Sequence, residues 1–299
     1  MSEVILTPSL SSPAKRKDSL AKNLALPRLL PWLLAGPLLT YMAVCYAIPV
    51  VSMLLRSLND PSWSLSRYAA LHGDTVFLKV FWITLSTSFV VTLSSLILGY
   101  PVAFALSRAR SMAPLILIVI LLPFWTSVLV RSYAWMVLLG RHGVINETLL
   151  ALGLLEQPLR LLNTTLATVI AMTHILLPYM ILPIANALRQ IDPSLARAAS
   201  GLGATPWGTF RQVILPLSMP GVAAGVLLVF VLALGFYITP AMVGGSREIT
   251  LSMLIAQQVD LLNWGYAATL SAVLLATALA LIAVARVLPG VGNALRMSK

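Results

Sequence analysis

The sequence is short of charge, cysteine and histidine, and each shortage excludes a class of protein. Only 10% of its 299 residues are charged and 59% are hydrophobic, whereas a soluble domain usually carries about a quarter charged residues. The single cysteine, Cys45, excludes an intrachain disulfide. His174 has no second metal ligand at a suitable spacing, and no phosphate-binding glycine loop or Ser/His/acid set is present. We therefore expect a chain that is not an enzyme and holds no metal or cofactor.

Acidic residues are scarce as well. All nine Asp and Glu side chains lie outside the long charge-free runs of the sequence, which argues against a proton relay within a membrane. The net charge of +11 comes from basic residues that are scattered, without an aromatic-interleaved patch. This pattern argues against nucleic-acid binding.

Long apolar runs are what the chain has in abundance. A helix needs roughly 20 apolar residues to cross about 30 Å of hydrocarbon, and each run reaches that length; the third continues past Arg131 to Leu139. We therefore predict an all-α integral membrane protein with six transmembrane helices. The charge-free runs are 29–55, 80–107, 111–130, 161–188, 212–246 and 261–285.

The basic residues indicate how the helices are oriented. With a cytoplasmic N-terminus and one crossing per run, thirteen cations fall on the inner side and six on the outer side, which is the positive-inside pattern and gives some affinity for anionic lipid head groups. Both termini are then cytoplasmic. The inner cations are Lys15, Arg16, Lys17, Lys22, Arg28, Arg108, Arg110, Arg189, Arg197, Arg211, Arg286, Arg296 and Lys299. The outer cations are Arg56, Arg67, Lys79, Arg141, Arg160 and Arg247.

The runs divide the chain into four parts. Residues 1–27, rich in Ser, Pro and Lys, are predicted to be a disordered cytoplasmic tail, and 289–299 a second tail. Residues 28–79 hold the first transmembrane helix and an external loop, and 80–288 form the main transmembrane domain. In that domain we place five spans at about 80–107, 111–139, 161–188, 217–240 and 261–286. A coupling loop lies at about 189–216.

The internal loop predicts a short helix outside the spans. Asp192 followed by Pro193 is an N-cap followed by proline in the first helical position, and Gly203 is placed to end the helix. A second helical stretch is expected from Trp207 to Val213. Small side chains permit close approach of another protein, although an ordinary amphipathic connector would show the same pattern.

At this loop the sequence resembles a known family. Ala198-Ala199, Gly203 and Val213-Ile214-Leu215-Pro216 are spaced as in the EAA loop of ABC importer permeases. The resemblance implies a coupling helix that inserts into an ATP-hydrolysing subunit. It assigns that role to Arg197, Ala198, Ala199, Gly203, Ala204, Leu215 and Pro216. Arg197 departs from the family, which has a glutamate there, so an ion pair made by that glutamate is not expected in this chain.

Further motifs are similar to those of spermidine/putrescine-type permeases. The resemblance implies the MetI-like type 1 importer fold and a multi-pass protein of the bacterial inner membrane. It also implies a second permease of the same fold, two copies of an ATPase and an external solute-binding protein as partners. The motifs are Leu98-Gly99-Tyr100-Pro101, Leu122-Pro123-Phe124-Trp125-Thr126-Ser127, Arg131-Ser132-Tyr133-Ala134-Trp135, Ile238-Thr239-Pro240-Ala241-Met242-Val243-Gly244-Gly245 and Asn263-Trp264-Gly265-Tyr266.

A translocation path is predicted near the third and fifth spans. Arg131 is the one cation within the predicted spans, and such a residue either faces a cavity or partner or lies at the interface and snorkels. The aromatic residues either bind an ammonium group or anchor and pack the helices. The candidate path residues are Trp125, Arg131, Tyr133, Trp135, Tyr237 and Pro240. Gly221 and Gly225 indicate a surface for close helix packing.

The sequence thus predicts a permease subunit that imports a small organic solute. The resemblance implies a polyamine such as spermidine or putrescine; an amino acid, an opine or another small solute is the alternative within the same class. A stand-alone secondary transporter is the alternative of another class, and it would need intramembrane ionisable residues or an inverted repeat. A membrane-embedded enzyme lacks any candidate site.

Overall fold

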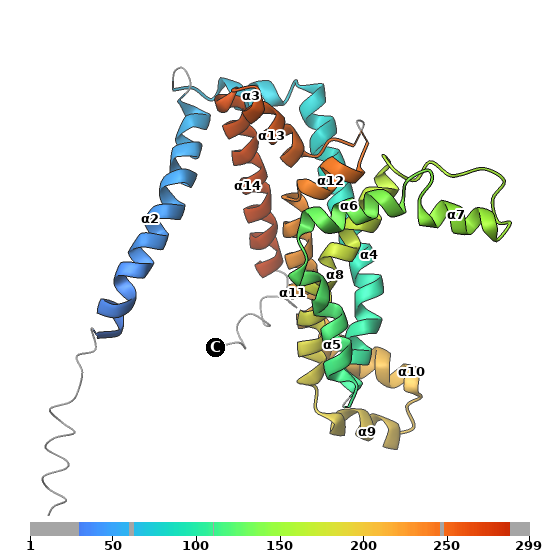
Figure 1. Ribbon diagram of the computed structural model, residues 1–299. Coiled ribbons are helices and arrows are strands. Elements are labelled where there is room, and N and C mark those ends of the chain that lie inside the picture. Colours follow the sequence, from blue (N-terminus) through green and yellow to red (C-terminus); the bar gives the residue numbers. More distant parts are fainter. Residues whose placement is uncertain (1–29, 60–62, 110, 246–247, 288–299) are drawn as a thin grey trace, which may run out of the picture. The chain divides into compact units, whose positions relative to one another are not determined.

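The computed structural model (Figure 1) describes residues 30–59, 63–109, 111–245 and 248–287. Most of these residues are helical, and the described residues form no strand beyond one isolated bridge between Asn59 and Trp63. The chain divides into two units, Met1–Met53 and Leu54–Lys299, which are taken separately here. Both predicted tails lie outside the described residues. Ten of the basic residues used to predict the orientation also lie outside the described residues, either completely or by their side chains. They are Lys15, Arg16, Lys17, Lys22, Arg28, Arg110, Arg247, Arg286, Arg296 and Lys299.

The first unit contributes most of one apolar helix. Helix α2 (Leu30–Leu58) continues through Pro37 and Pro49, and its segment Ala35–Leu58 is long and apolar enough to span a membrane. Between residues 35 and 53 nearly all its side chains are exposed. An apolar helix without a polar face needs lipid or other apolar surroundings. The helix therefore fits the first predicted span.

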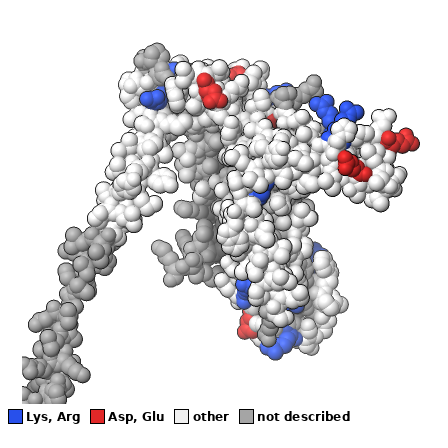
Figure 2. All heavy atoms as spheres, in the orientation of Figure 1, with Lys and Arg blue, Asp and Glu red and all other residues white. Residues whose placement is uncertain are grey.

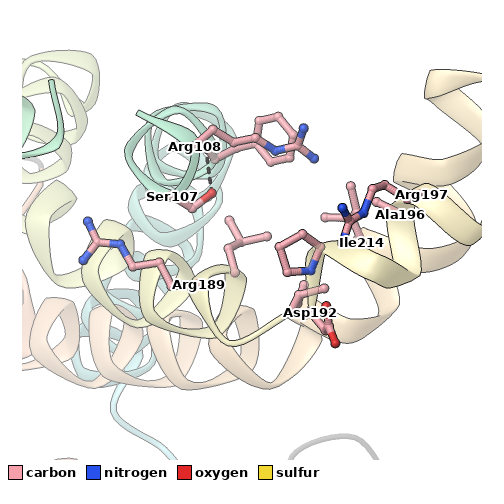
Figure 3. Close-up of a pocket in the computed structure, with 11 residues that line it drawn as sticks. Ser107, Arg108, Arg189, Asp192, Ala196, Arg197 and Ile214 are labelled. Atoms are coloured by element: carbon pink, nitrogen blue, oxygen red, sulfur yellow. Dashed lines mark hydrogen bonds between the residues drawn. The ribbon is translucent and has the colours of Figure 1, made fainter. Parts of the chain in front are cut away.

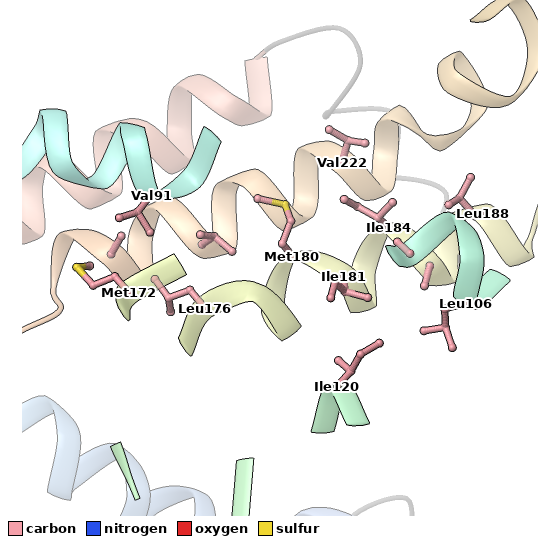
Figure 4. Close-up of a cluster of buried hydrophobic side chains, with 14 of the residues drawn as sticks. Val91, Leu106, Ile120, Met172, Leu176, Met180, Ile181, Ile184, Leu188 and Val222 are labelled. Atoms are coloured by element: carbon pink, nitrogen blue, oxygen red, sulfur yellow. The ribbon is translucent and has the colours of Figure 1, made fainter. Parts of the chain in front are cut away.

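The second unit is built on three long helices that pack pairwise, α4 (Thr75–Arg108), α8 (Thr165–Arg189) and α11 (Leu215–Leu234). Their shared core is apolar and includes Val91, Met180 and Val229, which are completely buried (Figure 4). Between helices in a bilayer, close van der Waals contact of such side chains stabilises the packing, because lipid tails are as apolar as the side chains themselves. The three helices form a rigid centre to which the shorter elements attach.

Glycine lets two of these helices approach closely. A Cβ atom added at Gly221 of α11 would lie 2.5 Å from Ala187 Cβ and 2.6 Å from the carbonyl oxygen of Pro183, both in α8. One added at Gly225 would lie 2.9 Å from Met180 Sδ. This confirms the predicted close-packing surface.

The third predicted span is bent. The helix pair Ala113–Trp125 and Val128–Leu138 turns by 98° at residues 126–127. Ser127 caps the second part by accepting a hydrogen bond from Leu129 N at 3.3 Å. Five helices of the described chain are long and apolar enough to span singly, and the bent pair makes six if it counts as one span. Its elements are α5 (Ala113–Leu121), the 3-10 helix η1 (Leu122–Trp125) and α6 (Val128–Leu138).

The remaining helices lie at the two ends of the second unit. At one end, called the α3 end here, Tyr266 Oη donates a 2.9 Å hydrogen bond to Asp74, the N-cap of α4. At the other, the α9 end, α4 and α8 finish in Arg108 and Arg189 (Figure 1). The α3 end includes α3 (Ser66–Leu71), α12 (Ile238–Val243), α13 (Leu251–Asp260) and the start of α14 (Trp264–Val287). α7 (Val144–Ala151) projects beside it.

Charged side chains are also concentrated at the two ends of the second unit. Figure 2 shows the charged side chains of this face gathered mainly at the two ends of the second unit, with a nearly uncharged surface between them. An apolar band between charged ends is the surface that a bilayer requires. The second unit therefore carries the surface pattern of a membrane-spanning bundle.

Candidate functional site

A short helix lies beyond the membrane-spanning helices at the α9 end. Helix α9 covers Pro193–Gly201, and Asp192 Oδ1 caps it by accepting a 2.8 Å hydrogen bond from Ser194 N. That hydrogen bond holds the pKa of Asp192 below its usual range, so the cap stays ionised. The observed helix and cap confirm the local structure predicted from Asp192 and Pro193.

The helix ends in a Schellman turn. Gly203 has φ +88°, its N–H donates to Ser200 O at 3.0 Å, and Ala204 N donates to Ala199 O at 3.0 Å. Glycine adopts this left-handed conformation without the steric cost that a side chain brings. Gly203 therefore ends the helix as predicted.

The side of α9 that faces away from the bundle carries apolar side chains. With 100° per residue, Leu195, Ala198 and Leu202 lie on one face, and all three are exposed, Leu202 by 90%. Trp207, in the next helix, is 68% exposed. Exposed apolar groups that are adjacent in this way mark a surface for contact with another molecule.

The chain passes directly from this surface into α11. Helix α10 (Pro206–Thr209) is followed by a π-helix, η2 (Phe210–Ile214), and then by Leu215 and Pro216 in the first turn of α11. The predicted helical stretch from Trp207 to Val213 is thus present, as parts of two short helices. π-helical turns occur often at functional sites. Residues 206–234 are therefore helical without interruption from α10 to the end of α11.

The structure brings most of the predicted coupling residues together. Arg197, Ala198 and Ala199 lie in α9, and Gly203 and Ala204 form its terminal turn. Leu215 and Pro216 lie farther along the same path, at the start of α11. Sequence reasoning did not single out Leu202, although an apolar residue between two glycines in a polar loop is a usable signal of exposure.

A cavity of about 390 Å³ lies at the bend of the third span. Arg131 lines it together with the hydroxyl residues Thr126 and Ser127 and the aromatic residues Tyr179 and Phe236. Arg131 is half-buried, and its Nε has no hydrogen-bond partner among the described residues. No carboxylate lines this cavity. The arrangement offers one cation and several aromatic faces to a ligand or partner.

The other predicted path residues are more dispersed. Trp125 and Tyr133 are 78% and 57% exposed, and Tyr237 is also exposed. Trp135 Nε1 donates a 3.2 Å hydrogen bond to Nδ1 of His174 in α8, a histidine that is exposed in this chain. Of these residues only Arg131 lines the cavity.

Pro240, the last path candidate, is buried in α12. The neighbouring Thr239 shares a 2.7 Å hydrogen bond with Ser132 of α6, which ties α12 to the bent span. Pro240 is therefore a packing residue beside the bent span.

These features define a polytopic helical membrane protein with an exposed helix beyond one end of its spans. Residues 24–292 match the family model described as binding-protein-dependent transport system inner membrane component. The chain therefore belongs to this family of inner-membrane permease subunits, whose ATPase is a separate subunit.

Curated relatives and solved structures agree with that assignment. The chain is 38% identical over 200 residues to the spermidine/putrescine transport system permease protein PotB of Haemophilus influenzae, covering 66% of this chain and 70% of that one. It is 35% identical over 200 residues to PotB of Escherichia coli, covering 66% and 73%. A bacterial ABC transporter for the import of alginate shares the fold, with a TM-score of 0.69 at 17% identity, covering 96% of this chain and 100% of that chain.

Proposed function

We propose that this chain is the membrane permease subunit of an ATP-driven importer that moves a polyamine, such as spermidine or putrescine, into the cell. The observation that carries the proposal is the capped helix α9 with its exposed apolar face, continuous with α11 through η2. The relatives named as spermidine/putrescine transport system permease proteins support the solute. Two ATPase copies, a second permease and a solute-binding protein complete the complex.

The proposed orientation puts the α9 end in the cytoplasm and both chain termini on that side. Arg108, Arg189, Arg197 and Arg211 all belong to elements at this end. A surplus of basic residues marks the cytoplasmic side of short loops. The ATPase would then approach Leu202 and its neighbours from below the membrane.

In the proposed cycle, α9 carries motion between the ATPase and the spans. When the ATPase subunits close on nucleotide, α9 moves with them and shifts η2 and the first turn of α11. Gly221 and Gly225 hold α11 tightly on α8, so α8 moves with it as a packed pair. The cavity around Arg131, which α8 also lines, opens to alternate sides.

A second candidate solute is favoured by Arg131. A cation in a partly open cavity without a carboxylate repels a dication and attracts an anionic group. The same importer class acting on an amino acid or an opine would supply a carboxylate to this guanidinium. In the polyamine proposal the partner permease supplies the acidic residues.

The coupling role is tested by changing Gly203. Gly203→Val forces a β-branched residue to positive φ, which costs roughly 1–2 kcal/mol, and we expect ATP-driven uptake and ATPase association to fall about tenfold. Gly153 is the matched control, because it too has positive φ, +67°, and open space around it, in the turn after α7.

The assay compares radiolabelled spermidine, putrescine and an amino acid in proteoliposomes that contain the whole complex. Gly153→Val should retain the uptake of the unaltered complex. Full uptake and ATPase association in Gly203→Val would remove the coupling role from α9, and uptake of the amino acid alone would replace the polyamine as solute.

A further inference from the structure

A second cavity lies on the opposite face of α9 from the exposed apolar face. It has a volume of about 480 Å³ and is enclosed by the ends of α4 and α8, the first turns of α9 and the π-helix η2 (Figure 3). From α9 it is lined by Pro193, Ala196 and Arg197. These residues follow a spacing of three and four, so they share the face turned toward the spans. The cavity is therefore separate from the surface that contains Leu202.

The cavity is strongly basic. Arg108, Arg189 and Arg197 line it from three different helices, with the Arg189 guanidinium turned away from the other two in Figure 3, and Asp192 is its one carboxylate. Asp192 already accepts the capping hydrogen bond from Ser194 N. Two positive charges therefore remain in excess at this place.

The arginines are held at the rim by weak contacts. The Arg108 guanidinium lies 4.6 Å from the centre of the Phe104 ring, and Arg189 donates a long, 3.5 Å hydrogen bond to Leu106 O. None of the three arginines forms a salt bridge within the described part of the chain. Each thus keeps donors free, and guanidinium donors match phosphate oxygens in pairs.

Apolar side chains line the rest of the cavity. Phe104, Leu188, Ile191 and Ile214 contribute to its wall, and the cavity lies where the long apolar helices α4 and α8 end. A ligand that fits must be anionic at one part and apolar at another. An anionic phospholipid has both properties, and basic pockets between spanning helices on the cytoplasmic side bind such head groups.

We propose that this cavity binds the phosphate head group of an anionic phospholipid of the inner leaflet, wedged between α9 and the ends of α4 and α8. The proposal rests on the proposed function for its cytoplasmic orientation. The bound lipid supports the inner face of α9 while the outer face contacts the ATPase. Loss of anionic lipid would then loosen the coupling helix without removing any of its own residues.

The competing occupant is an acidic side chain of the ATPase. Its approach is from the exposed face of α9, where Leu195 and Leu202 lie, whereas the cavity opens between α9 and the membrane helices. The mixed lining also favours an amphiphile over a single carboxylate. The lipid is therefore the better fit, and the ATPase is an outcome of the test.

The test counts lipids retained by the purified whole complex in native mass spectrometry. The complex is taken from membranes containing both phosphatidylglycerol and phosphatidylcholine, as the unaltered protein and as Arg108→Gln and Arg189→Gln. We expect preferential retention of phosphatidylglycerol by the unaltered complex and a decrease of about fivefold for each arginine removed, the effect of one cation near an anionic surface. Arg108→Lys should keep most of the retention, since it keeps the charge.

Arg211→Gln is the matched control, because Arg211 is an exposed arginine of η2 that does not line the cavity. Equal losses from Arg211→Gln and Arg108→Gln would overturn the proposal, and so would equal retention of the two lipids by the unaltered complex, a result that needs no variant to fold. Unchanged lipid retention with a reduced salt dependence of ATPase binding would assign the cavity to the ATPase. If the unaltered complex retains phosphatidylglycerol but does not take up polyamine, the lipid site stands and only the proposed solute is contradicted.

Discussion

Asp74 shows how one side chain can join two membrane helices. It caps α4 by accepting hydrogen bonds from Val76 N at 2.9 Å and Phe77 N at 3.2 Å, and its second oxygen accepts from Tyr266 Oη of α14. The Tyr266 hydrogen bond, followed by that from Phe77 N, holds the pKa of Asp74 below its ordinary value. The residue thus stabilises the α3 end in its ionised form.

Replacing Asp74 with alanine should cost about 1 kcal/mol of stability, the usual effect of losing an N-cap. Asp74→Asn is the control, because its amide oxygen still caps the helix while its amide nitrogen cannot accept from Tyr266 Oη, so the loss should be smaller than for alanine. Thermal unfolding of the purified complex measures both. Equal melting temperatures for Asp74→Ala and the unaltered protein would contradict this role.

The pH dependence of this contribution has a definite sign. Because folding lowers the pKa of Asp74, its contribution is complete above the ordinary aspartate pKa of roughly 4 and is lost as the pH falls through the lower folded value. The difference between Asp74→Ala and the unaltered protein should therefore shrink only in strong acid.

At the scale of elements, the close contact between α8 and α11 depends on the absence of a side chain. Gly221→Ala would push a Cβ against Ala187 and Pro183 of α8, and overpacking of this kind costs about 1–3 kcal/mol. We expect a lower melting temperature and reduced uptake. Gly235→Ala, at the C-cap of the same helix with no atom within 4 Å of the added Cβ, should change neither, and a loss as large as that of Gly221→Ala would show that the contact is not the cause.

Some elements could be predicted from the sequence because their signals are local. Asp192-Pro193 and Gly203 fix both ends of α9 by capping and by left-handed backbone geometry, and apolar length alone marks the spans. The 98° turn in the third span could not be predicted in this way. Ser127 is a recognisable N-cap for the second part, but a cap does not fix the angle between two helices, and tertiary contacts such as that between Ser132 and Thr239 lie outside any local pattern.

The candidate site was predictable only in part for the same reason. The coupling residues are consecutive or nearly so, and therefore a sequence pattern contains them. The basic cavity combines Arg108, Arg189 and Arg197 from three helices, and no short pattern relates residues so far apart. Folding of the bundle is what brings them together.

At the scale of the whole molecule, the two faces of α9 have different surroundings. The outer face, with Leu195 and Leu202, is free for a soluble partner, and the inner face with Arg197 closes a basic cavity against the spans. Arg197 stands where the family has glutamate, and its position on the inner face gives it a role in that cavity in the proposal made above. In the two proposals made above, α9 contacts the lipid and the spans on one face and the ATPase on the other.

Contact between the outer face of α9 and the ATPase can be measured directly. In a Cys45→Ser background, Leu202→Cys is labelled with a benzophenone maleimide and irradiated in membranes that contain the whole complex. The control is Leu152→Cys, at the C-cap of α7, where the leucine is 67% exposed. We predict a cross-linked product of permease and ATPase from position 202 and none from position 152; a product from position 152 alone, or from neither position, would contradict the account.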